Sequence, residues 1–172
     1  MSFPCDALVA DADTFAFRAV SVDAPASVVF RWLCQLRVAP YSYDWLDNFG
    51  RTSPSTLTPG LERIERGQRF MTIFQLVDFE PDRHITLTLA SRSSLALFGP
   101  IAVSYVVRDD GEGRTRLVVK LRVKSGRGIV GRARGGALAW CDLLMMRKQL
   151  LTLAKLSATT FTASERAAPS PS

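Results

Sequence analysis

The sequence predicts a single α+β domain in which a curved antiparallel sheet wraps around one long C-terminal helix. The middle of the chain is a run of short alternating segments separated by turn residues, and the last part is one long helical segment. The 172 residues are 47% hydrophobic and 22% charged, which is typical of one packed domain. We expect the domain over residues 14–161, an N-terminal extension over 1–13 and a disordered tail over 162–172.

The first elements are expected to be a strand and two short helices. Residues 14–22 alternate as in a strand, and the turn at 23–25 provides a helix start with proline in the first turn. Apolar residues then recur at spacings of three and four, which predicts a short amphipathic helix. A second short helix is expected over residues 40–50, where aromatic residues are spaced by four.

A series of antiparallel strands should follow, ending in the terminal helix. The expected strands cover residues 61–65, 68–79, 84–90, 101–108 and 116–124. The last of them alternates apolar and basic residues, so one face should be buried and the other solvated. The helix is expected over residues 132–161, long enough to cross the whole sheet.

Composition also excludes several classes of protein. The first 13 residues have neither the basic nor the apolar region of a secretory signal, and no apolar run approaches ~18 residues, so we expect a cytoplasmic protein. Cys5, Cys34 and Cys141 are far apart, and His84 is the only histidine. This predicts structural thiols, with neither a metal nor another cofactor.

The basic region before and into the terminal helix leaves two interpretations open. Its basic residues are Arg122, Lys124, Arg127, Arg132 and Arg134. They fit a phosphate group or transient contact with an anionic membrane surface, or simply a solvated surface, which is commoner. The G-x-G-x-x-G pattern over residues 126–131 lacks the βαβ unit that a dinucleotide site needs. Nucleic-acid binding is not expected, because no recognition motif accompanies the net charge of +6, and a dimer remains open.

Arg147 is unusual within the terminal helix. Steps of ~100° per residue place it near the middle of an otherwise apolar arc. The arc consists of Trp140, Leu143, Leu144, Leu150, Leu151 and Ala154. A guanidinium there suits a ligand's carboxylate, phosphate or enolate. The alternatives are an internal ion pair with Asp44 or Asp47, or a side chain that extends to solvent.

An aromatic cluster precedes the expected strands. Tyr41, Tyr43 and Asp44 are candidates for a pocket entrance, with hydroxyl and carboxyl groups suited to hydrogen bonding or proton transfer. The alternative is that the aromatic residues only dock the second helix. His84 opens a strand without a neighbouring nucleophile motif, so we expect no catalytic triad.

Three phrases of the sequence carry a resemblance to a known superfamily. They are residues 23–30, residues 40–45 with Asn48 and Arg51, and residues 142–150. With the order of elements, they resemble the START-like, or Bet v 1-like, superfamily, also called the SRPBCC or polyketide cyclase/dehydrase and lipid transport group, and in particular a bacterial branch of it. The resemblance covers residues 14–161 and implies the helix-grip fold, with a cavity between sheet and helix for lipids, polyketides or similar molecules.

The sequence thus predicts binding of a small hydrophobic or amphipathic molecule in that cavity. The expected ligand-binding residues are Tyr41, Tyr43, Asp44, Phe74, Leu76, Ile101, Val103, Tyr105, Leu117, Val119, Leu121, Trp140, Leu144, Arg147 and Leu151. One alternative is a cyclase or dehydratase in the same cavity, using Tyr43, Asp44 and Arg147. Another is a protein-interaction module whose interior is filled by its own aromatic side chains.

Overall fold

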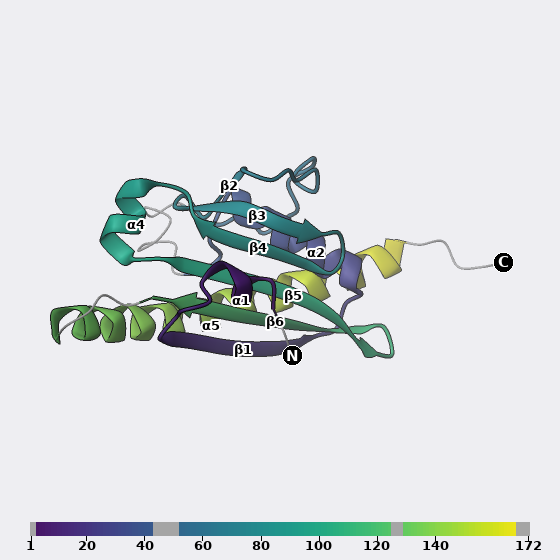
Figure 1. The fold of residues 1–172 in the computed structure, drawn as a ribbon. Coiled ribbons are helices and arrows are strands. Elements are labelled where there is room, and N and C mark those ends of the chain that lie inside the picture. The colour runs from purple at the N-terminus through teal and green to yellow at the C-terminus, as the bar shows by residue number, and fades with distance from the viewer. Residues whose placement is uncertain (1–2, 43–51, 125–128, 168–172) are drawn as a thin grey trace.

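The computed structural model describes residues 3–42, 52–124 and 129–167, and in the last range the described side chains are those of residues 145–166. Figure 1 shows the arrangement of the elements. In chain order these are α1 (Cys5–Leu8), β1 (Thr14–Val22), α2 (Ala26–Cys34), the 3-10 helix η1 (Gln35–Arg37), β2 (Arg69–Phe70), β3 (Phe74–Glu80), β4 (His84–Leu89), α4 (Arg92–Phe98), β5 (Ile101–Gly111), β6 (Arg114–Val123) and α5 (Ile129–Ala167).

The six strands form one curved antiparallel sheet in the order β1-β6-β5-β4-β3-β2. Consecutive strands from β2 to β6 are neighbours, and β1 returns to pair with β6 along nine residues. The long helix α5 runs along one face of this sheet, here called the inner face (Figure 1). The predicted α+β helix-grip arrangement is therefore confirmed.

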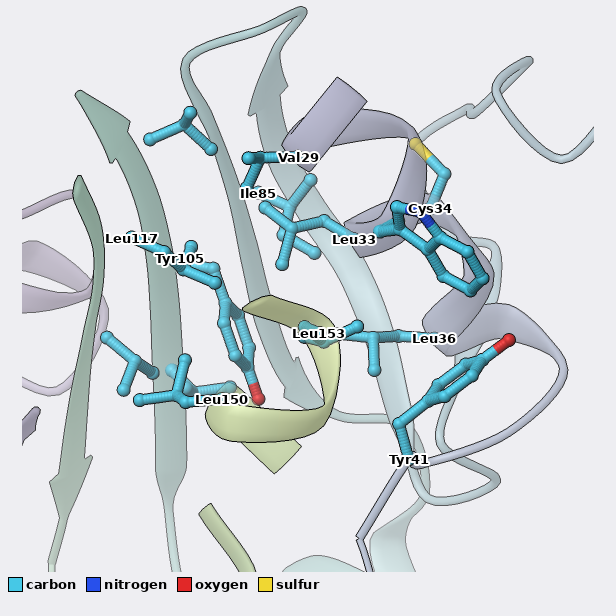
Figure 2. Packing of buried hydrophobic residues seen from close by; sticks show 14 of the residues in the cluster. Val29, Leu33, Cys34, Leu36, Tyr41, Ile85, Tyr105, Leu117, Leu150 and Leu153 are labelled. Carbon is cyan, nitrogen blue, oxygen red and sulfur yellow. The ribbon is translucent and has the colours of Figure 1, made fainter. Parts of the chain in front are cut away.

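The main core lies between the inner face, α2 and α5. Leu150 and Leu153 of α5 pack against the strands, with Leu117 and Ile85 among the buried strand residues (Figure 2). Alternation explains this packing, because every second residue of β6 faces inward. Helix α2 contributes Trp32 and its neighbours, and the spacing of its apolar residues gives it a buried side.

The N-terminal extension packs against the outer face of the sheet. Residues 3–9, which include α1, cover Ala102 and Val118 with Phe3, Cys5 and Val9, and these five residues form a second, smaller core. In β5 and β6, residues that face the outer side of the sheet are therefore buried, as well as those that face the inner side. A sheet covered on one face only would expose these outward apolar residues, but here the N-terminal extension covers them.

Several elements differ from those the sequence predicts. Residues 61–65 form a turn followed by irregular chain and not a strand. The expected strand 68–79 is split, because Met71 and Thr72 adopt positive φ angles of 44° and 65°. Helix α4 was not predicted, although Ser91 caps it by accepting a hydrogen bond from the backbone N–H of Ser94.

The helices expected over residues 132–161 and 40–50 have different outcomes. Helix α5 begins three residues before the predicted start and continues to Ala167, so the first part of the predicted tail, 162–167, is helical. Two short helices, α2 and η1, do follow β1. Most of the helix expected over 40–50 falls outside the described residues, while Tyr41 and Ser42 form a bend.

Candidate functional site

An open groove lies where the middle of α5 faces the loop after η1. Its volume is ≈ 570 Å³. The described residues that line it are Tyr41, Ser42, Ser53, Pro54, Ser55, Arg147, Lys148, Leu151, Thr152, Lys155 and Leu156. A space of this size is within the range of small-molecule sites in proteins, roughly 300–1,000 Å³.

The inner wall of the groove is anchored in the core. Tyr41 is 1% exposed and packs edge-on against Trp32, with ring centroids 5.8 Å apart (Tyr41 in Figure 2). The indole Nε1 of Trp32 donates a hydrogen bond of 3.0 Å to Thr160 Oγ1 of α5. Tyr41 has a φ of 55°, an unfavourable conformation for a bulky residue, so the surrounding packing has to hold it there.

Gln149 connects the groove to the sheet. The hydroxyl of Tyr105 donates to Gln149 Oε1 at 2.6 Å, and Gln149 Nε2 donates to the carbonyl oxygen of Pro40 at 2.6 Å. Gln149 is 5% exposed, so both hydrogen bonds lie in the core. They fix α5 relative to β5 and to the residue that precedes Tyr41.

The side chains around the groove fall into three chemical groups. Arg147, Lys148 and Lys155 are cationic; Ser42, Ser53, Ser55 and Thr152 carry hydroxyls; Tyr41, Pro54, Leu151 and Leu156 supply apolar surface. Among the described residues that line the groove, none is acidic. The groove therefore suits a molecule with an apolar part and an anionic group.

Three of the residues predicted from the sequence meet in this groove: Tyr41, Arg147 and Leu151. Arg147 is exposed, which agrees with the alternative in which its side chain extends to solvent, whereas Leu151, expected to face the interior, is 44% exposed. The buried stripe of α5 instead follows Met146, Leu150 and Leu153. This stripe is shifted by about one residue from the predicted apolar arc. The prediction missed the shift because Gln149 is polar, although it is buried, and a pattern of apolar residues does not include it.

The strand residues that were expected to line the cavity belong to the packed core wherever they contact the described half of α5. Leu76, Leu117 and Val119 have no exposed surface, so no space that admits a water molecule touches them. Val103, Tyr105 and Leu121 are also buried, while Phe74 and Ile101 are half-buried. The side chains of Trp140 and Leu144, together with Tyr43, Asp44 and Asp47, lie outside the described residues.

His84 lies away from this groove, next to Asp78. Its Nε2 is 3.1 Å from Asp78 Oδ2, and Arg66 also pairs with Asp78 at 2.8 Å. The hydrogen bond from His84 is the largest cause of the lowered pKa of Asp78, ahead of the opposing effect of burial. A smaller pocket of ≈ 280 Å³ adjoins His84, Arg83 and Glu80, and Arg83 and Glu80 pair with each other.

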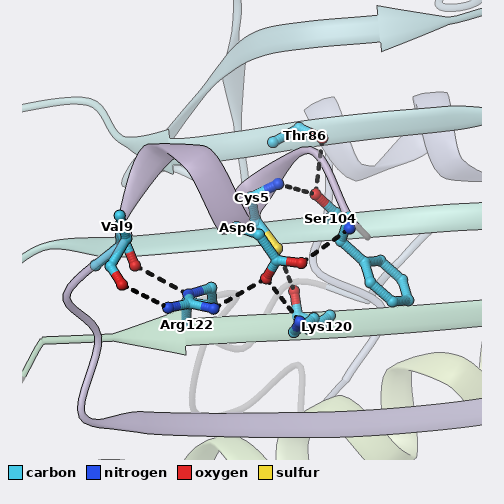
Figure 3. A network of polar contacts seen from close by, with 9 residues as sticks. Cys5, Asp6, Val9, Thr86, Ser104, Lys120 and Arg122 are labelled. Atoms are coloured by element: carbon cyan, nitrogen blue, oxygen red, sulfur yellow. Dashed lines mark hydrogen bonds and ion pairs between the residues drawn. The ribbon is translucent and has the colours of Figure 1, made fainter. Parts of the chain in front are cut away.

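Two residues of the predicted basic region have partners in the N-terminal extension, and Figure 3 shows those of Arg122. Arg122 pairs with Asp6 at 3.0 Å and donates to the backbone oxygens of Val9 and Ala10, and Lys124 pairs with Asp11. These contacts favour a structural role for Arg122 and Lys124. Within the described ranges, no helix has the length and apolarity needed to cross a bilayer.

Comparison with known proteins relates the chain to solved structures only. No family model matches it, and no curated protein does.

Similar structures include a hypothetical protein from Helicobacter pylori, with a TM-score of 0.54, 13% identity and coverage of 91% of this chain and 95% of that one. The Zhui aromatase/cyclase from Streptomyces sp. R1128 has a TM-score of 0.52 and 16% identity, with coverage of 84% and 93%. The di-domain aromatase/cyclase BexL has a TM-score of 0.51 and 13% identity over 83% of this chain, which spans 45% of the length of BexL. Identities this low establish the fold alone: the chain has the fold of these structures, which agrees with the resemblance of its sequence to the START-like, or Bet v 1-like, superfamily.

Proposed function

We propose that this protein binds a small amphipathic anion, with the anionic group near Arg147 and the apolar part along Leu151 and Leu156. The observation that carries the proposal is the composition of the groove, in which cationic and hydroxyl side chains adjoin apolar ones on a wall held by Gln149 and Tyr41. Exposed cations alone would suggest only a solvated helix face. Here they line a groove of ≈ 570 Å³ together with apolar side chains, which supports a ligand that has both an anionic group and an apolar part.

The expected affinity is modest because the groove is open. Burying about five methylene groups contributes about 4 kcal/mol, and one charge-assisted hydrogen bond contributes about 1.5–3 kcal/mol. Association and the ordering of flexible side chains offset part of this gain. A dissociation constant on the order of 0.1 mM follows for a simple probe.

Isothermal titration calorimetry with decanoate, and with decanol as the uncharged match, tests the proposal. Decanoate should bind at one site, and decanol should bind at least five-fold more weakly. Arg147→Gln should weaken decanoate to the level of decanol, whereas Arg92→Gln, an exposed arginine on α4 outside the groove, should leave binding unchanged. Equal affinities for the two probes, or no saturable binding of either, would refute the proposal.

The alternative of catalysis deserves a test of its own, because two of the similar structures are described as aromatase/cyclases. A cyclase needs a group that moves protons. The described lining of the groove offers a tyrosine and two lysines but neither a carboxylate nor an imidazole, which supports binding as the primary proposal. Ring formation from a poly-β-keto thioester, followed by absorbance and abolished by Arg147→Met with little change in affinity, would instead establish an enzyme.

A site deeper between the sheet and α5 is the second location that we propose for the same ligand class. The half-buried Phe74 and Ile101 support it. Ile101 begins β5 beside α4, at the end of the sheet toward which the first half of α5 extends (Figure 1). A bound probe should perturb different residues at the two locations, so an NMR titration distinguishes them.

A further inference from the structure

Strand β1 forms one edge of the sheet, opposite β2. Its nine residues pair with β6 in an unbroken register from Thr14 to Val22. Among the described strands β6 is its only partner, and Figure 1 shows β1 along the lower border of the sheet. An edge strand presents a row of backbone N–H and C=O groups that another extended chain can pair with.

Hydrogen bonds indicate which backbone groups of β1 face the open edge of the sheet. The guanidinium of Arg18 donates to the carbonyl oxygen of Phe17 at 2.7 Å, although the two residues are adjacent. The ladder agrees with this direction. The N–H of Lys124 donates to the carbonyl oxygen of Pro100, so even-numbered residues of β6 bond to β5 and odd-numbered ones bond to β1. The odd-numbered residues of β6 lie opposite even-numbered residues of β1, so Phe17 and the other odd-numbered residues of β1 direct their backbone groups to the open edge.

The same odd-numbered residues expose aromatic side chains on the outer face. Phe15 is 72% exposed and Phe17 is 45% exposed, and Phe17 packs edge-on against Phe3 at 5.7 Å. Edge strands are usually protected by proline, by a bulge or by charged side chains. The sequence of β1 contains neither proline nor lysine, and its pairing with β6 shows no bulge. Its one charged residue is Arg18, whose guanidinium has to release the carbonyl oxygen of Phe17 when another strand pairs with this edge.

We propose that β1 pairs antiparallel with β1 of a second copy of this chain, about a two-fold axis at Ala16. In this register each Phe15 lies opposite Phe17 of the other copy, so that four aromatic rings cover one another. On the inner face Arg18 lies opposite Thr14, and no two like charges face each other. The register centred on Arg18 would place two arginines directly opposite, which is unfavourable.

The partner of β1 is a second copy of the same strand because the sequence of β1 is complementary to itself in antiparallel pairing. Two-fold pairing matches aromatic residues with aromatic residues and hydrogen-bond donors with acceptors along one strand, as an isologous interface requires. The interface does not involve the groove, so it is independent of ligand binding.

Sedimentation velocity over a range of concentrations tests the dimer. The wild-type chain should show a monomer–dimer equilibrium, and Phe15→Lys should raise the dissociation constant at least ten-fold. Phe15 is mostly exposed, so this variant should fold. Leu97→Lys is the matched control, since Leu97 is 54% exposed on α4, and it should dimerise like the wild type. A wild-type chain that is monomeric at all concentrations would overturn the proposal, as would an edge that pairs with an added extended peptide but never with itself.

Disulfide trapping tests the register. Opposed Ala16 residues would form a pair without backbone hydrogen bonds, with Cα atoms about 4.5 Å apart, which a disulfide can span. Under mild oxidation Ala16→Cys should therefore form a covalent dimer, while Arg18→Cys and the wild type with its three native cysteines should not. Trapping by Arg18→Cys alone, or by neither variant, would overturn pairing about Ala16.

Discussion

Asp6 attaches the N-terminal extension to the outer face of the sheet. Its carboxylate lies 2.6 Å from Lys120 Nζ and 3.0 Å from Arg122, and it accepts a hydrogen bond from the backbone N–H of Phe3 (Figure 3). Burial raises the pKa of Asp6, but hydrogen bonds from Lys120, Phe3 and Arg122 outweigh this effect and lower the pKa to about 2 from 3.8. The charged form is thus favoured by folding.

Asp6→Asn should lower the free energy of unfolding by about 1–2 kcal/mol at pH 6, after allowance for solvent screening. A lowered pKa stabilises the fold above the ordinary pKa, and this contribution is lost as the pH falls from 3.8 through about 2. Urea unfolding of wild type and variant at pH 6, 4 and 2.5 measures it. The difference should shrink between pH 4 and 2.5, and a difference that is constant with pH would contradict the role of the charge.

Gln149→Leu should destabilise the fold by about 2–3 kcal/mol. It keeps the side chain at similar volume and removes two buried hydrogen bonds, from Tyr105 and to Pro40. Urea unfolding of Gln149→Leu, Tyr105→Phe and the double variant measures the coupling. We expect the double variant to cost less than the sum of the single changes, and strict additivity would show that the Tyr105 bond does not matter.

At the scale of elements, the corner between α4 and β5 depends on Gly99. This residue has a φ of 76°, and a Cβ there would lie 2.6 Å from the carbonyl oxygen of Lys124, the residue directly after β6. The same corner is closed by a hydrogen bond from the N–H of Lys124 to the carbonyl oxygen of Pro100. A side chain at position 99 would therefore push β5 and β6 apart.

Gly99→Ala should cost at least about 3 kcal/mol of unfolding free energy, the sum of left-handed backbone strain and the clash. Gly67→Ala is the matched control, because Gly67 has a φ of 88° but nothing lies within 4 Å of its Cβ position. It should cost only about 1–2 kcal/mol. Thermal or urea unfolding compares the two, and equal costs would mean that the Lys124 carbonyl moves away freely.

Elements with a strong sequence pattern are the ones that sequence predicts well. Strand β1 was expected over 14–22 and lies there, since its alternation and the helix start after it agree. Helix α4 was missed because seven residues with one polar cap are too short to show a period. The strand expected over 68–79 was divided by positive φ angles at Met71 and Thr72, where the packing of a turn overrides local preference.

At the scale of the whole molecule, the sequence predicted the architecture but only part of the site. Tyr41, Arg147 and Leu151 do meet in one groove, yet on the flank of α5 rather than beneath it. Two features shift them there: the buried Gln149, whose partners come from segments distant in sequence, and the loop at Ser53–Ser55, which no motif marks. Contacts between such distant segments have no signature in a single sequence.

The most direct test of amphipathic-anion binding in the groove is a two-dimensional NMR titration with decanoate that follows backbone amides and leucine methyls. Binding in the groove predicts saturable shifts at Leu151, Thr152 and Leu156, all of which disappear with Arg147→Gln. Shifts that are confined to the inner residues Phe74, Ile101 and Val103 would place the ligand between the sheet and α5. That result would contradict the groove as the binding site.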